Sequence, residues 1–312
     1  MTQRPAHLES APAQSVDFLV IGAGPTGLGA AARLERRGAE YLLVDASAQV
    51  GGAAAAETDA RGFSWSVAGA SGAQWQAIAE RLVDPNRLWL GTRIAHVDVA
   101  RRTAILADGR AVEYRWCVSS APLPTALSWA GARDLGVGLH AHRVLAVGVG
   151  FRGRVPAGLA SALDAEHAPW SRLIDSSQLA PAGHWSVLAE LRIPGRDDID
   201  TVRVVDSVVK ALAAYGAAPT TPATIWTREF APARPEPSED RDELLRAIDE
   251  RLRANGFFSR GLLGGWRPEA SDLGGAYRQG GEAVEAALAG AAEEAYWSGG
   301  ARPVAAEAET AA

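Results

Sequence analysis

Short apolar runs alternate with helical periodicity near the start of the chain. Residues 16–21 form an apolar run that ends at glycine, which predicts a strand buried on both faces of a parallel sheet. Residues 26–37 place apolar side chains on one helical face, and Gly38 provides a helix end. Residues 41–45 predict a second buried strand. This order predicts a βαβ unit, the opening of a Rossmann-like α/β fold.

A helix is predicted next, at 74–83, and short strands are predicted after it. Four short runs separated by turn residues predict a small antiparallel insertion, with strands at 88–90, 94–99, 103–106 and 112–118. A second strand-rich section predicts strands at 144–149, 184–191 and 224–227 and a helix at 201–215. The proline-rich run 231–237 predicts a connector. After one more helix, the final elements are a strand at 257–263 and a helix at 277–288.

These elements predict two domains, with a disordered tail at each end of the sequence. The polar, Pro/Ala-rich start (1–15) and the Ala/Glu-rich end (299–312) predict disordered tails. We expect a discontinuous Rossmann-like domain formed by residues 16–135 and 256–298, and a smaller mixed-sheet domain at 136–255.

Composition narrows the class of protein. The 312 residues are 47% hydrophobic, enough for a sizeable core. The net charge of -6 comes from interspersed signs, which disfavours nucleic acid as a partner. Cys117 is the single cysteine, so an internal disulfide is excluded and a reducing compartment is favoured. No apolar run is long enough to span a bilayer, and we expect a cytoplasmic protein without a membrane partner.

A G-x-G-x-x-G pattern at Gly22, Gly24 and Gly27 follows the first predicted strand. With 33 glycines in the chain, roughly 0.4 such matches are expected by chance, so the context must decide. The pattern lies between a buried strand and a helix, and Asp45 ends the second strand 18 residues after Gly27. This context predicts a dinucleotide site.

Each residue type has a physical use in such a site. Gly22 permits the tight turn, Gly24 leaves room for a pyrophosphate, and Gly27 allows close packing of helix and strand. The helix that opens at Pro25-Thr26 offers its unpaired N–H groups to the phosphates. The Asp45 carboxylate, followed by Ala46, accepts ribose hydroxyls and repels a 2′-phosphate, which disfavours NADP. The alternative is that these glycines make only a tight turn.

A glycine pair at Gly51-Gly52 separates FAD from NAD as the expected cofactor. In many FAD proteins such a pair follows the ribose-binding carboxylate after a short spacing and allows close backbone approach to the cofactor. An ordinary glycine turn is the alternative for the pair taken alone.

These residues, with others downstream, resemble the amine-oxidase-like FAD superfamily and within it protoporphyrinogen-oxidase-like and UDP-galactopyranose-mutase-like proteins. The resemblance rests on the glycine motifs and on the segments 62–65, 69–75, 91–94, 119–123, 261–266 and 279–280. It implies that Ile94 offers backbone groups to adenine. It also implies that Gly264, Gly265, Gln279 and a helix beginning near Tyr277 lie beside the flavin, where a helix N-terminus would stabilise negative charge on the reduced ring.

The chain departs from this family at several positions. Ser66-Val67-Ala68-Gly69 runs almost directly into a segment that comes much later in the relatives, so the helical substrate (cap) domain is expected to be missing. Leu262 replaces an arginine, Ala53-Ala54 replace polar or basic residues, and Gly274-Gly275 replace an Asp-His pair. Sugar-nucleotide mutase activity is therefore disfavoured.

No catalytic base is predicted, and no residue spacing indicates a metal site. Trp65 and Trp266 either line the site or belong to the core. Tyr277, Arg278 and Glu269 are the polar residues nearest the flavin-facing segment, and a solvated surface is the alternative for the two charged ones. Cys117 is expected to be a packed thiol.

The leading functional hypothesis is an FAD-dependent oxidoreductase that acts on a small molecule of biosynthetic metabolism, with hydride transfer to flavin N5. The first alternative is a redox-neutral flavoenzyme of the isomerase or elimination type. The second is a noncatalytic FAD-binding subunit. A homodimer or another protein partner would cover the flavin in place of the missing domain.

Overall fold

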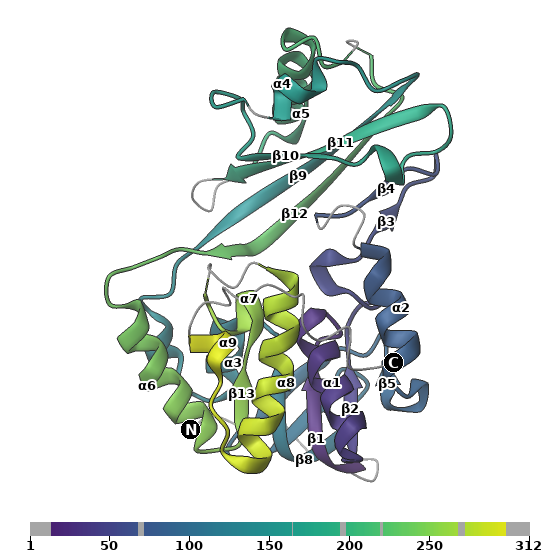
Figure 1. Ribbon diagram of the computed structural model, residues 1–312. Helices are drawn as coiled ribbons and strands as arrows, with labels where there is room; N and C mark the ends of the chain where they lie inside the picture. The colour runs from purple at the N-terminus through teal and green to yellow at the C-terminus, as the bar shows by residue number, and fades with distance from the viewer. Residues whose placement is uncertain are drawn as a thin grey trace. The chain divides into compact units, whose positions relative to one another are not determined.

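The computed structural model describes residues 14–67, 72–163, 165–193, 198–218, 221–267 and 272–297. The chain divides into two compact units (Figure 1). The first comprises Met1–Gly52, Ala77–Leu139 and Pro237–Ala312, and the second comprises Ala53–Gln76 and His140–Glu236. Each unit is described by itself below.

A seven-stranded sheet forms the centre of the first unit. Its order is β5-β2-β1-β8-β7-β6, and β13 also pairs with β8. The strands are β1 (Gln14–Ile21), β2 (Tyr41–Val44), β5 (Leu88–Trp89), β6 (Ile94–Asp98), β7 (Thr103–Leu106), β8 (Ala111–Ser119) and β13 (Phe257–Ser259). Pairing is parallel for β1 with β2 and β8, whereas β6, β7 and β8 pair antiparallel. The predicted Rossmann-like α/β fold is confirmed.

Helices complete the first unit. They are α1 (Pro25–Arg37), α3 (Leu123–Trp129), α6 (Arg241–Arg253), α7 (Gly261–Gly264), α8 (Leu273–Ala289) and α9 (Glu294–Trp297), with the short helices η3 (Pro85–Arg87) and η4 (Arg133–Gly136). α1 and α8 lie side by side in Figure 1 and pack extensively. The chain passes from the first unit to the second within η1 (Gly52–Ala54) and returns to the first unit within α2 (Gly72–Leu82).

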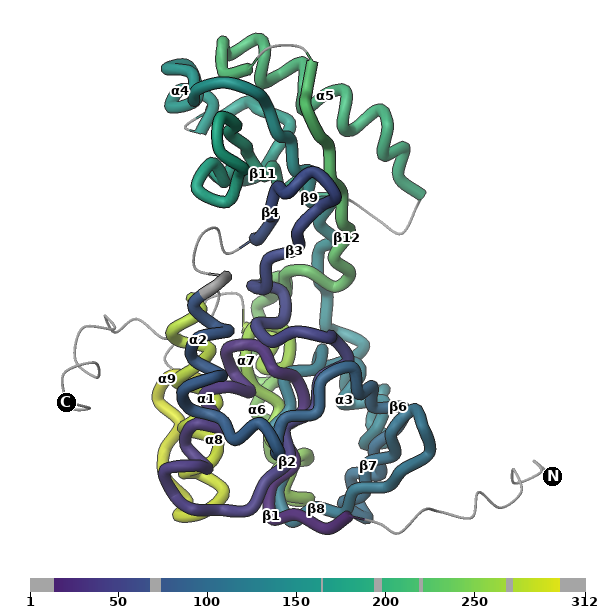
Figure 2. Tube along the Cα trace, turned by 90° about the vertical axis from the view of Figure 1, so that its right-hand side faces the viewer, coloured from purple at the N-terminus to yellow at the C-terminus, as the bar shows by residue number. Residues whose placement is uncertain are grey.

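The second unit is built on an antiparallel sheet of order β10-β11-β9-β12. Its strands are β9 (Ala141–Arg152), β10 (Arg172–Asp175), β11 (His184–Ile193) and β12 (Thr224–Pro235), with helices α4 (Leu159–Leu163), α5 (Thr201–Ala214) and η5 (Ser177–Leu179). Apolar residues of α4 and α5 cover one sheet face. A hairpin of β3 (Glu57–Thr58) and β4 (Ser64–Trp65) packs on the other, as Figure 2 shows.

Several predicted boundaries need correction in the first unit. Gln14 and Ser15 are not part of a tail, because they pair with β8 as the start of β1. The strand predicted at 257–263 ends at Ser259, and α7 replaces its second half. The last helix begins at Leu273, four residues earlier than predicted, because Asp272 caps it. Residues 1–13 and 298–312 lie outside the described residues.

The second unit also differs from the prediction. Its paired strands are antiparallel and not mixed. The proline-rich run continues β12 up to Pro235 because β12 is an edge strand, and its pairing is interrupted between Phe230 and Arg234. Residues 241–253 fall in the first unit, where α6 packs on β13. Residues 53–76 fall in the second unit, because Phe63 and Trp65 of this segment belong to its core.

Among the helices of the described ranges, none combines the length and the apolar content that crossing a bilayer requires.

Candidate dinucleotide site

The turn between β1 and α1 has the geometry that its glycines predict. Gly22 has a φ of 98°, which disfavours any side chain. A Cβ atom added to Gly27 would lie 1.7 Å from the Gly22 carbonyl oxygen. The turn therefore needs glycine at both positions in order to form.

No side chain caps the amino end of α1. Its N-cap is Gly24, which has no side chain, and Pro25 opens the helix. By contrast, α5 and α8 are capped by aspartates whose carboxylates accept hydrogen bonds from their first-turn amides. The first-turn amides of α1 and the positive end of its dipole are thus left for an anion.

The glycine pair of the sequence lies directly against this turn. Gly51 N donates a hydrogen bond to Ala23 O at 2.8 Å. A Cβ atom added to Gly52 would lie 3.2 Å from Gly24 Cα. Only backbone atoms therefore lie around Gly24, where a pyrophosphate would approach. Gly51-Gly52 packs against the glycine turn and so is more than an ordinary turn of its own.

Asp45 lies beside the same turn, at the end of β2. Its Oδ2 accepts a hydrogen bond from Ala23 N at 2.6 Å and its Oδ1 accepts one from Ser47 N at 2.7 Å. Each carboxylate oxygen keeps a further lone pair, so the half-buried group can still accept ribose hydroxyls. Exposed Ala46 follows it.

The loop that leads to Ile94 is tied to the same strand end. Thr92 N donates to Asp45 O at 2.7 Å, and Gly91 N donates to Ser47 O at 2.7 Å. Ile94 begins β6 two residues later and is half-buried. These bonds therefore fix the segment before Ile94 against the end of β2 that carries Asp45.

Ser120 belongs to this site, although only the resemblance drew attention to its segment. A Cβ atom added to Gly22 would lie 2.1 Å from Ser120 Oγ, which hydrogen-bonds to Ile21 O at 3.1 Å. Ser120 follows β8, which pairs with β1 on the side opposite β2. The residue thus lies at the topological switch point where dinucleotides bind in such sheets. A polar residue directly after a buried strand was the available sequence signal.

The other residues expected beside the flavin have packing roles. A Cβ atom on Gly264 would lie 2.9 Å from Ser119 O, and one on Gly265 would lie 2.8 Å from Gly261 O. Gln279 is fully buried, and its side chain accepts from Gly261 N at 2.9 Å and donates to Ala295 O at 3.3 Å. Gln279 therefore positions α7 against α8, and its contact with the cofactor stays a prediction.

The amino end of α8, in contrast, is capped by a side chain. Asp272 accepts hydrogen bonds from Gly274 N at 3.1 Å and Gly275 N at 2.8 Å. A negative flavin group at this end would meet that carboxylate, so α8 is less suited than predicted to stabilise a reduced flavin. Tyr277 and Arg278 are half-buried in its first turns, and Arg278 Nη2 lies 3.9 Å from Asp272 Oδ2.

The two tryptophans proposed to line the site are buried. Trp65 has no exposed surface and stacks between Phe63 and Trp226, with ring centroids 5.8 and 6.2 Å apart. Trp266 is 2% exposed and has a φ of 54°. Core packing explains both better than contact with a substrate. Glu269, also considered near the flavin, lies outside the described residues.

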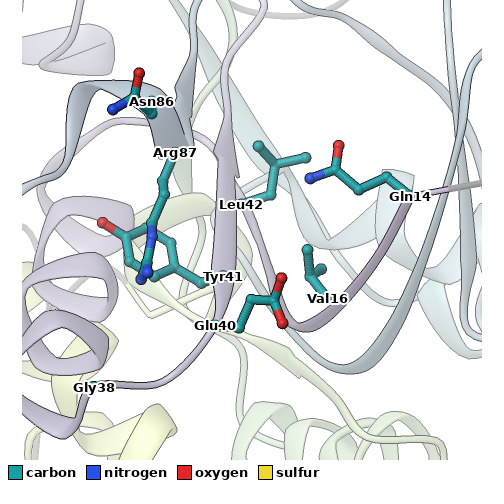
Figure 3. Close-up of a pocket in the computed structure, with 8 residues that line it drawn as sticks. All are labelled: Gln14, Val16, Gly38, Glu40, Tyr41, Leu42, Asn86 and Arg87. Carbon is teal, nitrogen blue, oxygen red and sulfur yellow. The ribbon is translucent and has the colours of Figure 1, made fainter.

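One cavity of about 340 Å³ lies elsewhere in the first unit (Figure 3). Gln14 and Val16 at the start of β1 and Tyr41 and Leu42 at the start of β2 line it. The glycine turn follows the other end of β1, so this cavity is not the dinucleotide site. Within the described ranges, no group of three His, Cys, Asp or Glu side chains could hold a metal ion.

Cys117 should be chemically inert in the folded protein. Complete burial in β8 raises the pKa of its thiol well above the ordinary value, so the reactive thiolate is scarce. A thiol reagent such as DTNB should modify the native protein far more slowly than the protein in guanidinium chloride. Rapid stoichiometric modification of native protein would contradict this assignment.

Comparison with known families supports the dinucleotide interpretation. A family model described as an NAD(P)-binding Rossmann-like domain matches residues 20–81, the span that contains the glycine turn, Asp45 and the glycine pair.

Solved structures share the fold over nearly the whole chain. The crystal structure of reduced UDP-galactopyranose mutase superposes with a TM-score of 0.82 at 16% identity, covering 91% of this chain and 96% of that one. A protoporphyrinogen oxidase-like protein of Exiguobacterium sp. 255-15 gives 0.61 at 12% identity, covering 89% and 99%. Putrescine oxidase bound to putrescine gives 0.60 at 11%, also covering 89% and 99%. At these identities the similarity establishes the fold, and the predicted resemblance to amine-oxidase-like flavoproteins is confirmed at that level.

Proposed function

Starting from the fold of the amine-oxidase-like FAD flavoproteins, we propose that this protein binds FAD and is an oxidoreductase that acts on a small molecule. The expected biosynthetic role, the cytoplasmic location and the loss of the helical domain are parts of this proposal. The observation that carries it is the uncapped amino end of α1, with only backbone around Gly24 and a carboxylate one strand away.

The residues of the site fit the parts of FAD by their chemistry. The amides that follow Gly24 would bind the pyrophosphate, and Asp45 would accept the hydroxyls of the adenosine ribose. Ile94 would offer backbone groups to adenine. Bound FAD would supply an acceptor for a substrate hydride at flavin N5. Among the described residues of the first unit, half-buried Tyr277 and Arg278 are the candidates for substrate contact.

A redox-neutral reaction is the second candidate function. It is favoured by the superposition on UDP-galactopyranose mutase, which has the highest TM-score of the three structures compared. The two functions differ in their need for reductant. An oxidoreductase should lose its flavin absorbance when its substrate is added without oxygen, whereas a redox-neutral enzyme should turn over only after dithionite reduction and without net consumption of reductant. A noncatalytic FAD-binding subunit should do neither alone.

Gly24→Ala should strongly weaken FAD binding and leave the fold intact. A Cβ atom at Gly24 would meet Gly51 and Gly52 at 3.8 to 4.0 Å, an ordinary contact, but the side chain would fill the approach of the pyrophosphate. The ratio of flavin to protein absorbance after purification should fall about tenfold or more. FAD is to be identified by release and chromatography.

Gly281→Ala, in α8, is the matched control, since its Cβ would have at least 3.7 Å of clearance. Its flavin content should equal that of the wild type. A wild-type protein that stays colourless after incubation with FAD would overturn the proposed function.

A further inference from the structure

The two faces of the β10-β11-β9-β12 sheet differ in character. Residues at odd-numbered positions of β9 and β11 face the apolar core with α4 and α5. The opposite face carries Glu190, around which guanidinium groups lie on three strands: Arg172 on β10, Arg192 on β11, and Arg228 and Arg234 on β12. This group is called the arginine face below.

Glu190 joins two of these arginines. Its side chain is 5% exposed, and its oxygens lie 3.5 Å from Arg172 Nη1 and 3.2 Å from Arg234 Nη2. The two arginine side chains are 50% and 44% exposed. The buried carboxylate therefore holds two guanidinium groups in fixed directions while both remain open to solvent, with one net positive charge among the three.

Further carboxylates lie at this face, and one of them, Glu236, pairs with His142. Glu57 of the β3–β4 hairpin pairs with Arg228. The four guanidinium groups of the arginine face therefore exceed the carboxylates of Glu190, Glu57 and Glu236 by one positive charge. A cationic ligand would have to displace an arginine from its carboxylate, whereas an anion could add to donors already oriented.

Aromatic rings lie next to these charges. The stack of Phe63, Trp65 and Trp226 covers Gly150 and Gly148 of β9, and Trp226 is its half-buried last ring. Half-buried Phe230 follows on β12, beneath the Arg228 guanidinium at 4.9 Å. An apolar or planar group attached to an anion would have ring surface to contact here.

We propose that the arginine face recognises the substrate, and that the substrate is an organic anion: a carboxylate or phosphate ester carried on a ring or another apolar group. Arg172 and Arg234 bind the anionic group as a pair, and Glu190 is the positioning residue that orients them. This inference rests on the proposed function, because it names the substrate class of the same enzyme.

The test uses the full-length protein with its FAD and three probes that share one ring: phenylacetate, phenyl phosphate and phenethylamine. Tryptophan fluorescence or calorimetry at low salt should detect binding of at least one anion and much weaker binding of the amine, and the stronger anion identifies the carboxylate or phosphate class. Arg172→Gln and Arg234→Gln should each weaken that binding about tenfold, because each removes a charged hydrogen-bond donor. Arg234→Lys, which keeps the charge without the planar fork, should fall between wild type and Arg234→Gln.

Arg203→Gln is the control, since it removes the same charge from the exposed surface of α5 in the same unit. It should bind the anion as the wild type does. Equal or tighter binding of the amine, no binding of either anion at millimolar concentration, or unchanged anion binding in both folded arginine variants would overturn the inference. The flavin absorbance of the same samples distinguishes the two proposals. Absence of FAD would contradict the proposed function, whereas the titration with the anions tests the anion site.

Discussion

Gly280→Ala should lower the free energy of unfolding by about 3 kcal/mol. Gly280 lies in α8 where this helix meets α1, and an added Cβ atom would lie 1.8 Å from Thr26 O and 2.8 Å from Ala30 N. Both neighbours are backbone atoms of a helix and cannot move aside as a flexible side chain could. Alanine therefore forces the two helices apart and outweighs its better helix propensity, which is worth about 1 kcal/mol. Chemical denaturation of both proteins measures the difference.

Gly281→Ala provides the matched control one residue further along α8. Its Cβ would lie 3.7 Å or more from Gly29 O and the Arg33 side chain, so the substitution should be neutral or stabilising by up to about 1 kcal/mol. Equal stability of the two alanine variants would show that α1 and α8 are not in close contact at Gly280. Since Thr26 is in the first turn of α1, Gly280→Ala should also reduce FAD content.

Glu293→Ala should destabilise the protein by about 3 to 5 kcal/mol. The Glu293 carboxylate binds Arg260 through Nε at 2.6 Å and Nη2 at 2.7 Å, and both side chains are buried. Asp249 of α6 lies 2.8 Å from Arg260 Nη1. Burial alone would lower the pKa of Arg260, but its bonds to Glu293 and the charge of Asp249 raise it, so the guanidinium stays charged. Removing Glu293 leaves that charge underpaired in the interior.

An exposed ion pair is the appropriate comparison. Asp108 and Arg110 lie 2.8 Å apart at a hairpin turn, and Asp108→Asn should leave the thermal midpoint almost unchanged because solvent screens the pair. A Glu293→Ala midpoint as high as that of Asp108→Asn would show that the Arg260 cluster does not stabilise the fold. Arg260 directly precedes Gly261, which contacts Thr26, so the cluster also supports the segment behind the dinucleotide site.

Local signals in the sequence were sufficient to predict the β1-α1-β2 unit and its candidate site. Gly22, Gly24, Gly27 and Asp45 lie within 24 residues, and their roles follow from backbone geometry and helix ends that neighbours in the chain decide. α1 and β2 matched their predicted limits within one residue, and β1 begins two residues before its predicted start. The Rossmann-like fold class followed because buried parallel strands leave continuous apolar runs.

Tertiary structure decided what depends on residues far apart in the chain. Ser120 reaches Gly22 only because β8 pairs with β1, and the pairing of strands is not visible in either segment alone. The proline-rich end of β12 is a strand because it lies at a sheet edge, where missing N–H donors cost little. Trp65 is core because Gly148 leaves room for its ring. Such contacts depend on the volume and hydrogen-bonding of the partner, whereas periodicity reports only which side of an element is buried.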